Sequence, residues 1–177
     1  GYTATDNGDG TATISGYNVD TATISGNGLA IVSVPETVTV GGKELKVTAV
    51  AANAFANNAE IGYIILPASI KTIGEKAFYN CASLVVADIS TCKLNTIGAS
   101  AFEGTSLTKI TLALSEMKEI GAYAFKISTL MQFVPAEGEE NRSMLIKADL
   151  KEGEFFFVYQ QVALSFTKAE NRAIGIY

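Results

Sequence analysis

The sequence contains no histidine, and this absence excludes more functions than any other feature of its composition. Histidine is the side chain on which most general acid-base catalysis and most zinc sites depend. Without it, a Ser-His-Asp or Cys-His catalytic arrangement cannot be built, and a zinc ion would have to rely on two cysteines. We therefore expect no catalytic residues of these classes, no metal site and no cofactor.

Positive charge is missing from the start of the chain, where the first basic residue is Lys43. The whole sequence has 13 basic and 18 acidic residues, so its formal net charge is -5. Nucleic-acid binding needs clustered Lys and Arg, and we expect no nucleic-acid partner. No apolar run approaches the roughly 20 residues of a membrane helix, so we also expect no direct membrane insertion.

Cysteine is rare, with only Cys81 and Cys92 present. The residues from Leu84 to Ile89 between them have the periodicity of a strand and would span about 20 Å, whereas a disulfide needs Cα atoms within about 7 Å. The two residues could be bridged only if the chain doubled back. We favour two ordinary thiols over a disulfide, because a buried free cysteine behaves as a small hydrophobic residue.

A repeated dipeptide dominates what is present in the chain. The 177 residues are enough for one domain with a sizeable core, and 48% of them are hydrophobic, which excludes disorder, collagen and coiled coil. Ala-Phe occurs four times, with phenylalanines 23, 24 and 23 residues apart: Phe55, Phe78, Phe102 and Phe125. So constant a spacing indicates a repeat protein.

The residues around each Phe recur with it. Ile-Gly stands five and four positions before three of the phenylalanines, and Val50-Ala51 fills these positions in the first unit. The third residue after each Phe is small and mostly polar, and Cys81 belongs to this set. An L-x-x-I-x-L pattern follows, whose final spacing of two is typical of a strand. Segments such as Lys71-Thr72-Ile73 predict a second, shorter strand.

Units of this size cannot bury their own apolar side, but units stacked in register share one continuous core. We expect their strands to form a parallel sheet. We also expect each Gly-x-x-Ala-Phe segment to form one short helical or 3₁₀ turn on the opposite side. The Phe and Leu side chains would then face each other across the core.

The unit from Ile73 to Leu84, with the sequence IGEKAFYNCASL, resembles the repeat of the BspA-like leucine-rich repeat proteins of bacterial surfaces, roughly I-G-x-x-A-F-x-x-C-x-x-L-x-x-I-x-I-P. The resemblance covers about residues 29–135 and includes Leu66-Pro67. It departs at Val50-Ala51 and at the second and third strand ends, which lack Pro. It implies an α/β fold: a short right-handed leucine-rich-repeat solenoid with a parallel β-sheet on the concave side and short helical or 3₁₀ turns opposite.

Solenoids need caps, because their terminal units otherwise expose apolar side chains and strand edges. We expect residues 1–28 to form an N-terminal β-hairpin cap, since Thr11–Gly16 and Thr21–Gly26 are the same alternating hexapeptide. Residues 29–135 would be the solenoid, with a degenerate repeat at 29–46, which ends in a turn at Gly41–Glu44, and then four units of 23–24 residues. Residues 136–177 would form a C-terminal β-rich cap of the same single domain. There Phe155-Phe156-Phe157 favours a buried capping strand over an exposed binding patch.

Two acidic segments could carry chemistry without histidine. Glu139 with Glu140, or Asp6 with Asp9, could act as paired carboxylates, but nothing around them in the sequence would raise a pKa. The stretch from Asp6 to Gly10 is similar to the start of a calcium-binding loop, yet Tyr17 occupies the twelfth position, where an EF-hand needs Glu. We interpret this stretch as a turn, and we expect the protein not to be an enzyme.

The candidate binding residues alternate with the inward-facing residues of the predicted strands and would therefore point to the concave side. They are Tyr63, Ile65, Val86, Asp88, Lys109, Thr111, Gln132 and Val134. Such a mixture of apolar, aromatic and charged side chains is found in protein-binding patches, although a solvent-exposed sheet surface that binds nothing would have a similar composition.

The resemblance implies a non-enzymatic, secreted or cell-surface interaction module that adheres to host or neighbouring-cell proteins through the concave sheet. A chain that starts at Gly1 without Met fits the removal of either a signal peptide or an expression tag, and we expect an extracellular or cell-surface location. We expect a protein ligand of unknown identity and a monomer. The alternatives are a carbohydrate-binding or accessory module of a surface complex, which the absence of Trp disfavours, and a structural spacer.

Overall fold

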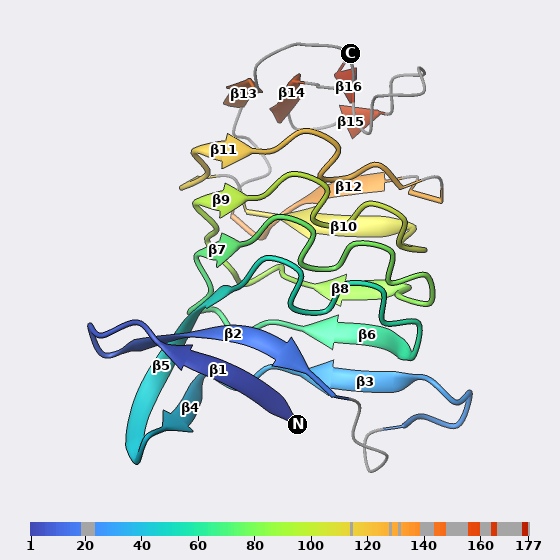
Figure 1. Cartoon of the computed structure of the whole chain (residues 1–177). Helices are drawn as coiled ribbons and strands as arrows, with labels where there is room; N and C mark the ends of the chain where they lie inside the picture. Colours follow the sequence, from blue (N-terminus) through green and yellow to red (C-terminus); the bar gives the residue numbers. More distant parts are fainter. Residues whose placement is uncertain are drawn as a thin grey trace.

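Figure 1 shows the computed structural model of the chain, in which the repeat units form a stack of coils. The structure describes residues 1–18, 24–113, 115–127, 129, 130 and 132–138, and four short strands nearer the C-terminus. Within these residues every regular element is a β-strand. The same part of the chain contains no helix that is long and apolar enough to cross a membrane.

The first face of the stack carries the strands of the L-x-x-I-x-L pattern. β3 (Ala30–Ser33), β6 (Ile61–Ile65) and β8 (Val86–Asp88) form a parallel sheet, and β10 (Lys109–Leu112) pairs in parallel with β12 (Gln132–Pro135). We call the solvent-exposed side of these five strands the outer sheet face. Parallel strands of this pattern were predicted, and Ile64, Ala87 and Ile110 are buried in them as expected.

The second face carries the shorter strands that precede each turn. β7 (Thr72–Ile73), β9 (Thr96–Ile97) and β11 (Glu119–Ile120) continue in parallel from β5 (Lys43–Val50), and the prediction of a second short strand is confirmed. Figure 1 places them across the stack from the outer sheet face. β4 (Thr37–Val40) folds back onto β5 through the predicted turn, which occupies Gly41 and Gly42.

The N-terminal hairpin exists, but its predicted partner strand was wrong. β1 (Tyr2–Asp6) pairs antiparallel with β2 (Thr11–Tyr17), and β2 then pairs in parallel with β5. The stretch from Asp6 to Gly10 is the hairpin turn, in which Gly8 and Gly10 have φ of 83° and 88°, a region that favours glycine. Of the second hexapeptide, Ile24 makes only an isolated bridge to Ala30, and Thr21 to Thr23 lie outside the described residues.

The C-terminal segment contains two further strand pairs. β13 (Met144–Lys147) pairs antiparallel with β14 (Phe156–Tyr159), and β15 (Leu164–Ser165) pairs with β16 (Gly175–Ile176). Strands were predicted in these regions. Phe155 and the acidic pair at 139–140 lie outside the described residues.

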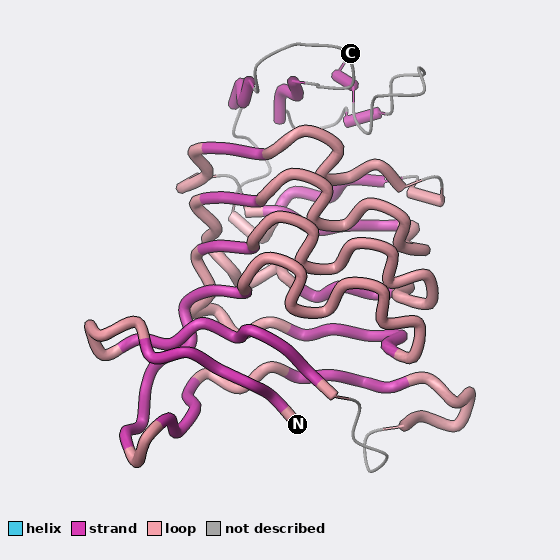
Figure 2. Tube along the Cα trace, viewed as in Figure 1, coloured by secondary structure: helices cyan, strands magenta, loops and turns pink. Residues whose placement is uncertain are grey.

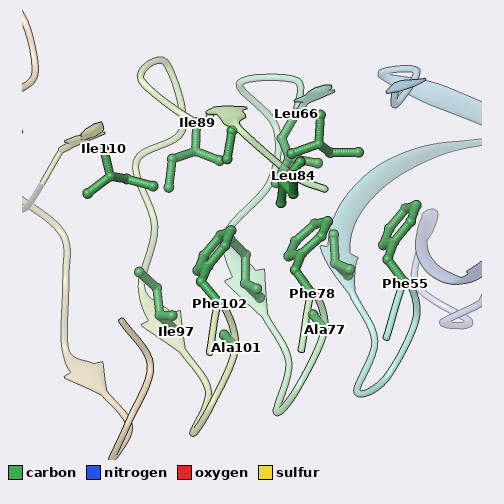
Figure 3. Packing of buried hydrophobic residues seen from close by; sticks show 14 of the residues in the cluster. Phe55, Leu66, Ala77, Phe78, Leu84, Ile89, Ile97, Ala101, Phe102 and Ile110 are labelled. Atoms are coloured by element: carbon green, nitrogen blue, oxygen red, sulfur yellow. The ribbon is translucent and has the colours of Figure 1, made fainter. Parts of the chain in front are cut away.

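The core is a column of phenylalanine rings that faces a row of aliphatic side chains. Neighbouring ring centroids of Phe55, Phe78, Phe102 and Phe125 lie 5.0, 5.1 and 5.6 Å apart, with ring planes no more than 10° from parallel. Figure 3 shows three of these rings opposite Leu66, Leu84, Ile89 and Ile110. All four phenylalanines are buried, so the predicted inward Phe and Leu rows are confirmed.

The Gly-x-x-Ala-Phe segments are successive β-turns and not the helical or 3₁₀ turns that we predicted; Figure 2 shows them as loops. The N–H of Ala77 donates to Gly74 O at 3.2 Å, and the N–H of Cys81 donates to Phe78 O at 3.2 Å. The third residue of each of these turns, Lys76 and Asn80, has φ of 55°. A helix excludes this left-handed conformation, whereas type II turns require it. Positive φ recurs at the equivalent residues Asn53, Asn57, Ser100, Gly104 and Tyr123.

The turns also bond to one another along the stack. The N–H groups of Phe55, Phe78 and Phe102 each donate over 2.8 Å to the carbonyl of the alanine that precedes the next Phe. The N–H groups two positions before and after each of these phenylalanines also donate to carbonyls of the next coil, as in the bonds from Asn53 N to Glu75 O at 3.0 Å and from Asn57 N to Tyr79 O at 2.8 Å. In this ladder the donor always belongs to the earlier coil and the acceptor to the later one.

Candidate binding face

The outer sheet face presents the side chains that alternate with the buried ones. Ile65 and Val86 are 40% and 44% exposed, Asp88 and Lys109 are exposed, and Tyr63, Thr111 and Val134 are half-buried. Gln132 begins β12, directly beside Lys109 in the register. The predicted binding residues thus all lie in the strands that form this face.

Strand register arranges these residues in rows across the coils. Tyr63 lies beside Ile31 on one side and Val86 on the other, and Ile65 lies between Ser33 and Asp88. In the second sheet, Lys109 is beside Gln132 and Thr111 is beside Val134. The structure therefore places the eight predicted residues in two groups, one on each sheet.

Two exposed apolar residues of this face were missed from the sequence. Ile31 is 41% exposed next to Tyr63, and Val85 is 38% exposed directly before β8. Ile31 could have been found, because Ala30–Ser33 precedes Val34-Pro35 as a strand precedes the apolar-Pro end of a repeat. Together with Ile65 and Val86 they make the β3, β6, β8 side of the face strongly apolar.

The outer sheet face is interrupted between β8 and β10. In the described part of the chain no ladder joins these two strands, although β9 and β11 pair on the other side of the same coils. The phenylalanine column is likewise continuous there, with 5.1 Å between Phe78 and Phe102. The coils are therefore stacked normally, and only the outer sheet is broken.

A one-residue difference between repeats explains the break. The leucine-type residue that precedes the strand follows Phe by six positions in the second unit, at Leu84, and by five in the third, at Leu107. Accordingly, the N–H of Val85 bonds to Gly62 O at 2.9 Å, whereas the corresponding contact one coil later is from Ser106 N to Leu84 O at 3.0 Å. The approach to β10 is thus shifted relative to the approach to β8, and the ladder ends between these two strands.

A hollow of about 280 Å³ lies at this break. Its walls come from both strands and from the residues that flank them: Val85, Val86, Ala87, Asp88, Ser90, Thr108, Lys109 and Thr111. Four of the eight predicted binding residues are in this set. The β8 side of the hollow contributes three apolar residues together with Asp88 and Ser90, and the β10 side contributes two threonines and Lys109.

The two charged residues of the hollow, Asp88 and Lys109, differ in their hydrogen-bond partners. Asp88 Oδ1 accepts hydrogen bonds from Ser90 N at 3.2 Å and from Ser90 Oγ at 2.7 Å. Within the described residues, Lys109 makes no ion pair or side-chain hydrogen bond, and neither do the hydroxyl groups of Thr108 and Thr111. The available donors therefore belong to the β10 wall.

The thiols offer no reactive group. Cys81 and Cys92 are both free and buried, which confirms the prediction of two ordinary thiols. Each donates to a backbone carbonyl of the preceding coil, Cys81 Sγ to Phe55 O at 3.0 Å and Cys92 Sγ to Pro67 O at 3.2 Å. Burial raises the pKa of each thiol to about 11, so neither is a thiolate at neutral pH.

The acidic turn near the N-terminus uses its carboxylates to hold the backbone. Asp6 Oδ1 accepts from Gly8 N at 2.8 Å, and Asp9 Oδ1 accepts from Thr11 N at 3.0 Å and from the Thr11 hydroxyl. The hydrogen bonds from Thr11 lower the pKa of Asp9. The described residues contain no group of three or more His, Cys, Asp or Glu side chains that could hold a metal ion.

The stacked coils, with short parallel strands on two faces and a ladder of buried Phe and Leu, define a leucine-rich repeat protein. The family model of the BspA type leucine rich repeat region, in 6 copies, matches residues 42–140. The chain therefore belongs to the BspA-type leucine-rich repeat family.

Solved structures of bacterial leucine-rich repeat proteins share the fold. A protein from Bacteroides capillosus is 26% identical, with a TM-score of 0.58 over 76% of this chain and 93% of its own. A protein from Bacteroides ovatus is 25% identical, with a TM-score of 0.51 over 77% of this chain, which spans only 39% of that protein. A leucine-rich cell surface protein from Faecalibacterium prausnitzii is 20% identical, with a TM-score of 0.54 over 76% of this chain and 41% of its own. No protein of curated function matches the sequence significantly.

Proposed function

We propose that this chain is a non-enzymatic protein-interaction module that binds its partner through the outer sheet face. The observation that carries the proposal is the exposure, by 38% to 44%, of four large apolar side chains in or next to one sheet, which we call the apolar cluster: Ile31, Ile65, Val85 and Val86. Apolar surface gathered on one face of a soluble protein is typical of an interaction site. The polar and charged residues of β10 lie beside this cluster, as the rim of a protein interface does.

We further infer that the stack is a short solenoid capped by the N-terminal hairpin and the C-terminal strands, and that the module is secreted or surface-attached. Membership of the BspA-type family supports this location, and so does the cell-surface description of the relative from Faecalibacterium prausnitzii. Adhesion to host or neighbouring-cell proteins is the form of interaction that fits such a location best.

Carbohydrate binding is the second candidate function. Sugars are usually bound by clustered aromatic rings on which they stack. Tyr63 is the only aromatic residue at the outward positions of the described strands of this face, and it is half-buried. This composition favours a protein partner over a sugar.

The experiment is a paired screen of the purified chain on an array of secreted and membrane-ectodomain proteins and on a glycan array. Binding should appear on the protein array and should be lost in Ile65→Glu and in Val86→Glu, which place a charge on the apolar cluster. Ala52→Glu is the matched control, because Ala52 is exposed on the turn before Phe55, away from this face. Retained binding by both face variants would refute the proposal, and glycan binding alone would favour the second candidate.

A further inference from the structure

We propose that the hollow between β8 and β10 selects the partner: it receives an extended segment of a protein in which an acidic side chain adjoins an apolar one. This inference rests on the proposed function and adds the chemistry of the ligand to it. The carboxylate would lie against Lys109 and the neighbouring threonine hydroxyls, and the apolar side chain would lie against Val85 and Val86.

The β10 wall supplies the hydrogen-bond donors for a carboxylate. Lys109 is exposed, and its ammonium group makes no ion pair with a described residue. Thr108 and Thr111 line the same hollow, and the structure gives their hydroxyl groups no partner. An ammonium group beside hydroxyl groups suits an anionic acceptor, because bonds between charged groups are the stronger hydrogen bonds.

The acidic residue of the hollow does not cancel this preference. Asp88 Oδ1 is already the acceptor of two hydrogen bonds from Ser90, at 3.2 and 2.7 Å. No described residue bonds to Asp88 Oδ2, so a basic ligand could reach that oxygen. Against this one oxygen the hollow presents the Lys109 ammonium group and the hydroxyl groups of two threonines, so donor groups without a partner are in excess and an acidic side chain is favoured.

The β8 wall fixes where the apolar side chain lies. Val85 and Val86 are 38% and 44% exposed and line the hollow opposite Lys109. Two successive residues of an extended segment point in opposite directions, so one can reach each wall. The interruption of the sheet makes this arrangement specific to one coil, because β3, β6 and β8 pair continuously and leave no gap.

The test uses three pools of fluorescent nonapeptides, randomised except for a central Val-Glu, Val-Gln or Val-Lys pair, and measures anisotropy against the whole chain. The Val-Glu pool should bind about three- to fivefold more tightly than the Val-Gln pool, the range expected for one partly exposed ion pair. High salt should reduce the ratio towards one, since it screens such a pair.

Variants assign the preference to the hollow. Lys109→Met should make the Val-Glu and Val-Gln pools equal, and Thr111→Val should narrow the difference. Lys118→Glu is the matched control, because Lys118 is exposed but precedes β11 on the other side of the stack. It changes the net charge more than Lys109→Met does, and it should leave the preference intact.

Two results would overturn the proposal: equal binding of the Glu and Gln pools to the wild-type chain, or a Glu preference that survives in Lys109→Met. Tighter binding of the Val-Lys pool would also overturn it and would assign recognition to Asp88. These outcomes are separate from those of the array screen. If Val86→Glu abolishes array binding while the pools bind equally, the module binds proteins but the hollow does not select acidic segments.

Discussion

A Cβ atom placed on Gly98 would lie 2.4 Å from the backbone nitrogen of Glu75, one coil earlier. Gly74 and Gly121 stand in the same relation to Ala52 and Ala99, at 2.5 and 2.3 Å. Real Cβ atoms do not approach backbone atoms so closely. The glycine of the Ile-Gly pair is therefore required by the distance between coils and not by its φ angle.

Gly98→Ala should consequently destabilise the fold, because the methyl group has to push two coils apart. We expect a loss of about 1 to 3 kcal/mol, as for other overpacked sites, measured as a fall in the urea midpoint. Gly26→Ala is the control, since nothing lies within 4 Å of its Cβ position. Equal effects of the two substitutions would contradict the close-approach argument.

Phe78→Ala should be among the most damaging substitutions. Its ring is fully buried between those of Phe55 and Phe102, with centroids 5.0 and 5.1 Å away. Truncation leaves a cavity in the middle of the column and should cost about 3 to 5 kcal/mol. Tyr79→Ala removes the adjacent, half-buried ring and should cost about 1 kcal/mol or less in the same urea titration. A small loss in Phe78→Ala would mean that neighbouring coils collapse into the space.

The buried thiols should make the fold sensitive to alkaline pH. Folding raises the pKa of each thiol from 9.0 to about 11, mainly because burial disfavours the charged thiolate. Between these values the unfolded chain loses thiol protons that the folded chain keeps, so the free energy of unfolding falls as pH rises. The expected slope is up to about 1.4 kcal/mol per pH unit for each thiol, and it vanishes below pH 9.

The measurement is a urea titration under reducing conditions at about pH 8 and at about pH 10. A Cys81→Ala, Cys92→Ala double variant should lose most of the difference between the two conditions. Tyr2, whose pKa is raised to about 12 by burial and by Tyr17, adds its own decline only above pH 10. An unchanged slope in the double variant would rule out the thiols as its cause.

Tyr2→Phe tests how the hairpin is attached to the first coil. The Tyr2 hydroxyl donates to Ser33 O, at the end of β3, over 2.6 Å. Removing this hydroxyl should cost about 1 kcal/mol and lower the thermal midpoint. Tyr79→Phe removes a hydroxyl for which the structure gives no partner, and it should be neutral. Were both variants neutral, the bond from Tyr2 would contribute nothing to stability.

The core could be predicted because it depends on spacing alone. A fixed period brings Phe55, Phe78 and Phe102 to the same place in successive coils, whatever the backbone does between them. The turns could not be predicted in the same way. Lys76 and Ser100 adopt positive φ, a backbone conformation that residues other than glycine rarely adopt. Hydrogen bonds from their N–H groups to the next coil hold them in it.

Most residues of the candidate binding face could be predicted from the sequence, but not their arrangement. Period-two alternation identified Val86 and Lys109 as outward-facing residues, since it needs only local information. The gap between them depends on the register of one coil against the next, which the one-residue difference before Leu107 alters. The predicted hairpin partner of Thr11–Gly16 was wrong because the turn with positive φ at Gly8 and Gly10 pairs this segment with the strand before it and not with the second hexapeptide.

The ladder between the turns gives the stack a polarity. Every interior turn presents acceptors to the coil before it and donors to the coil after it, so a whole unit could be duplicated or excised and its new neighbours would still match. The first turn has no earlier coil, and no hydrogen bond within the described residues reaches the carbonyls of Ala52, Ala54 and Ala56. Adding or removing an interior unit should therefore leave this hydrogen-bond ladder intact, whereas the N-terminal end of the stack needs a different structure to cover its first turn.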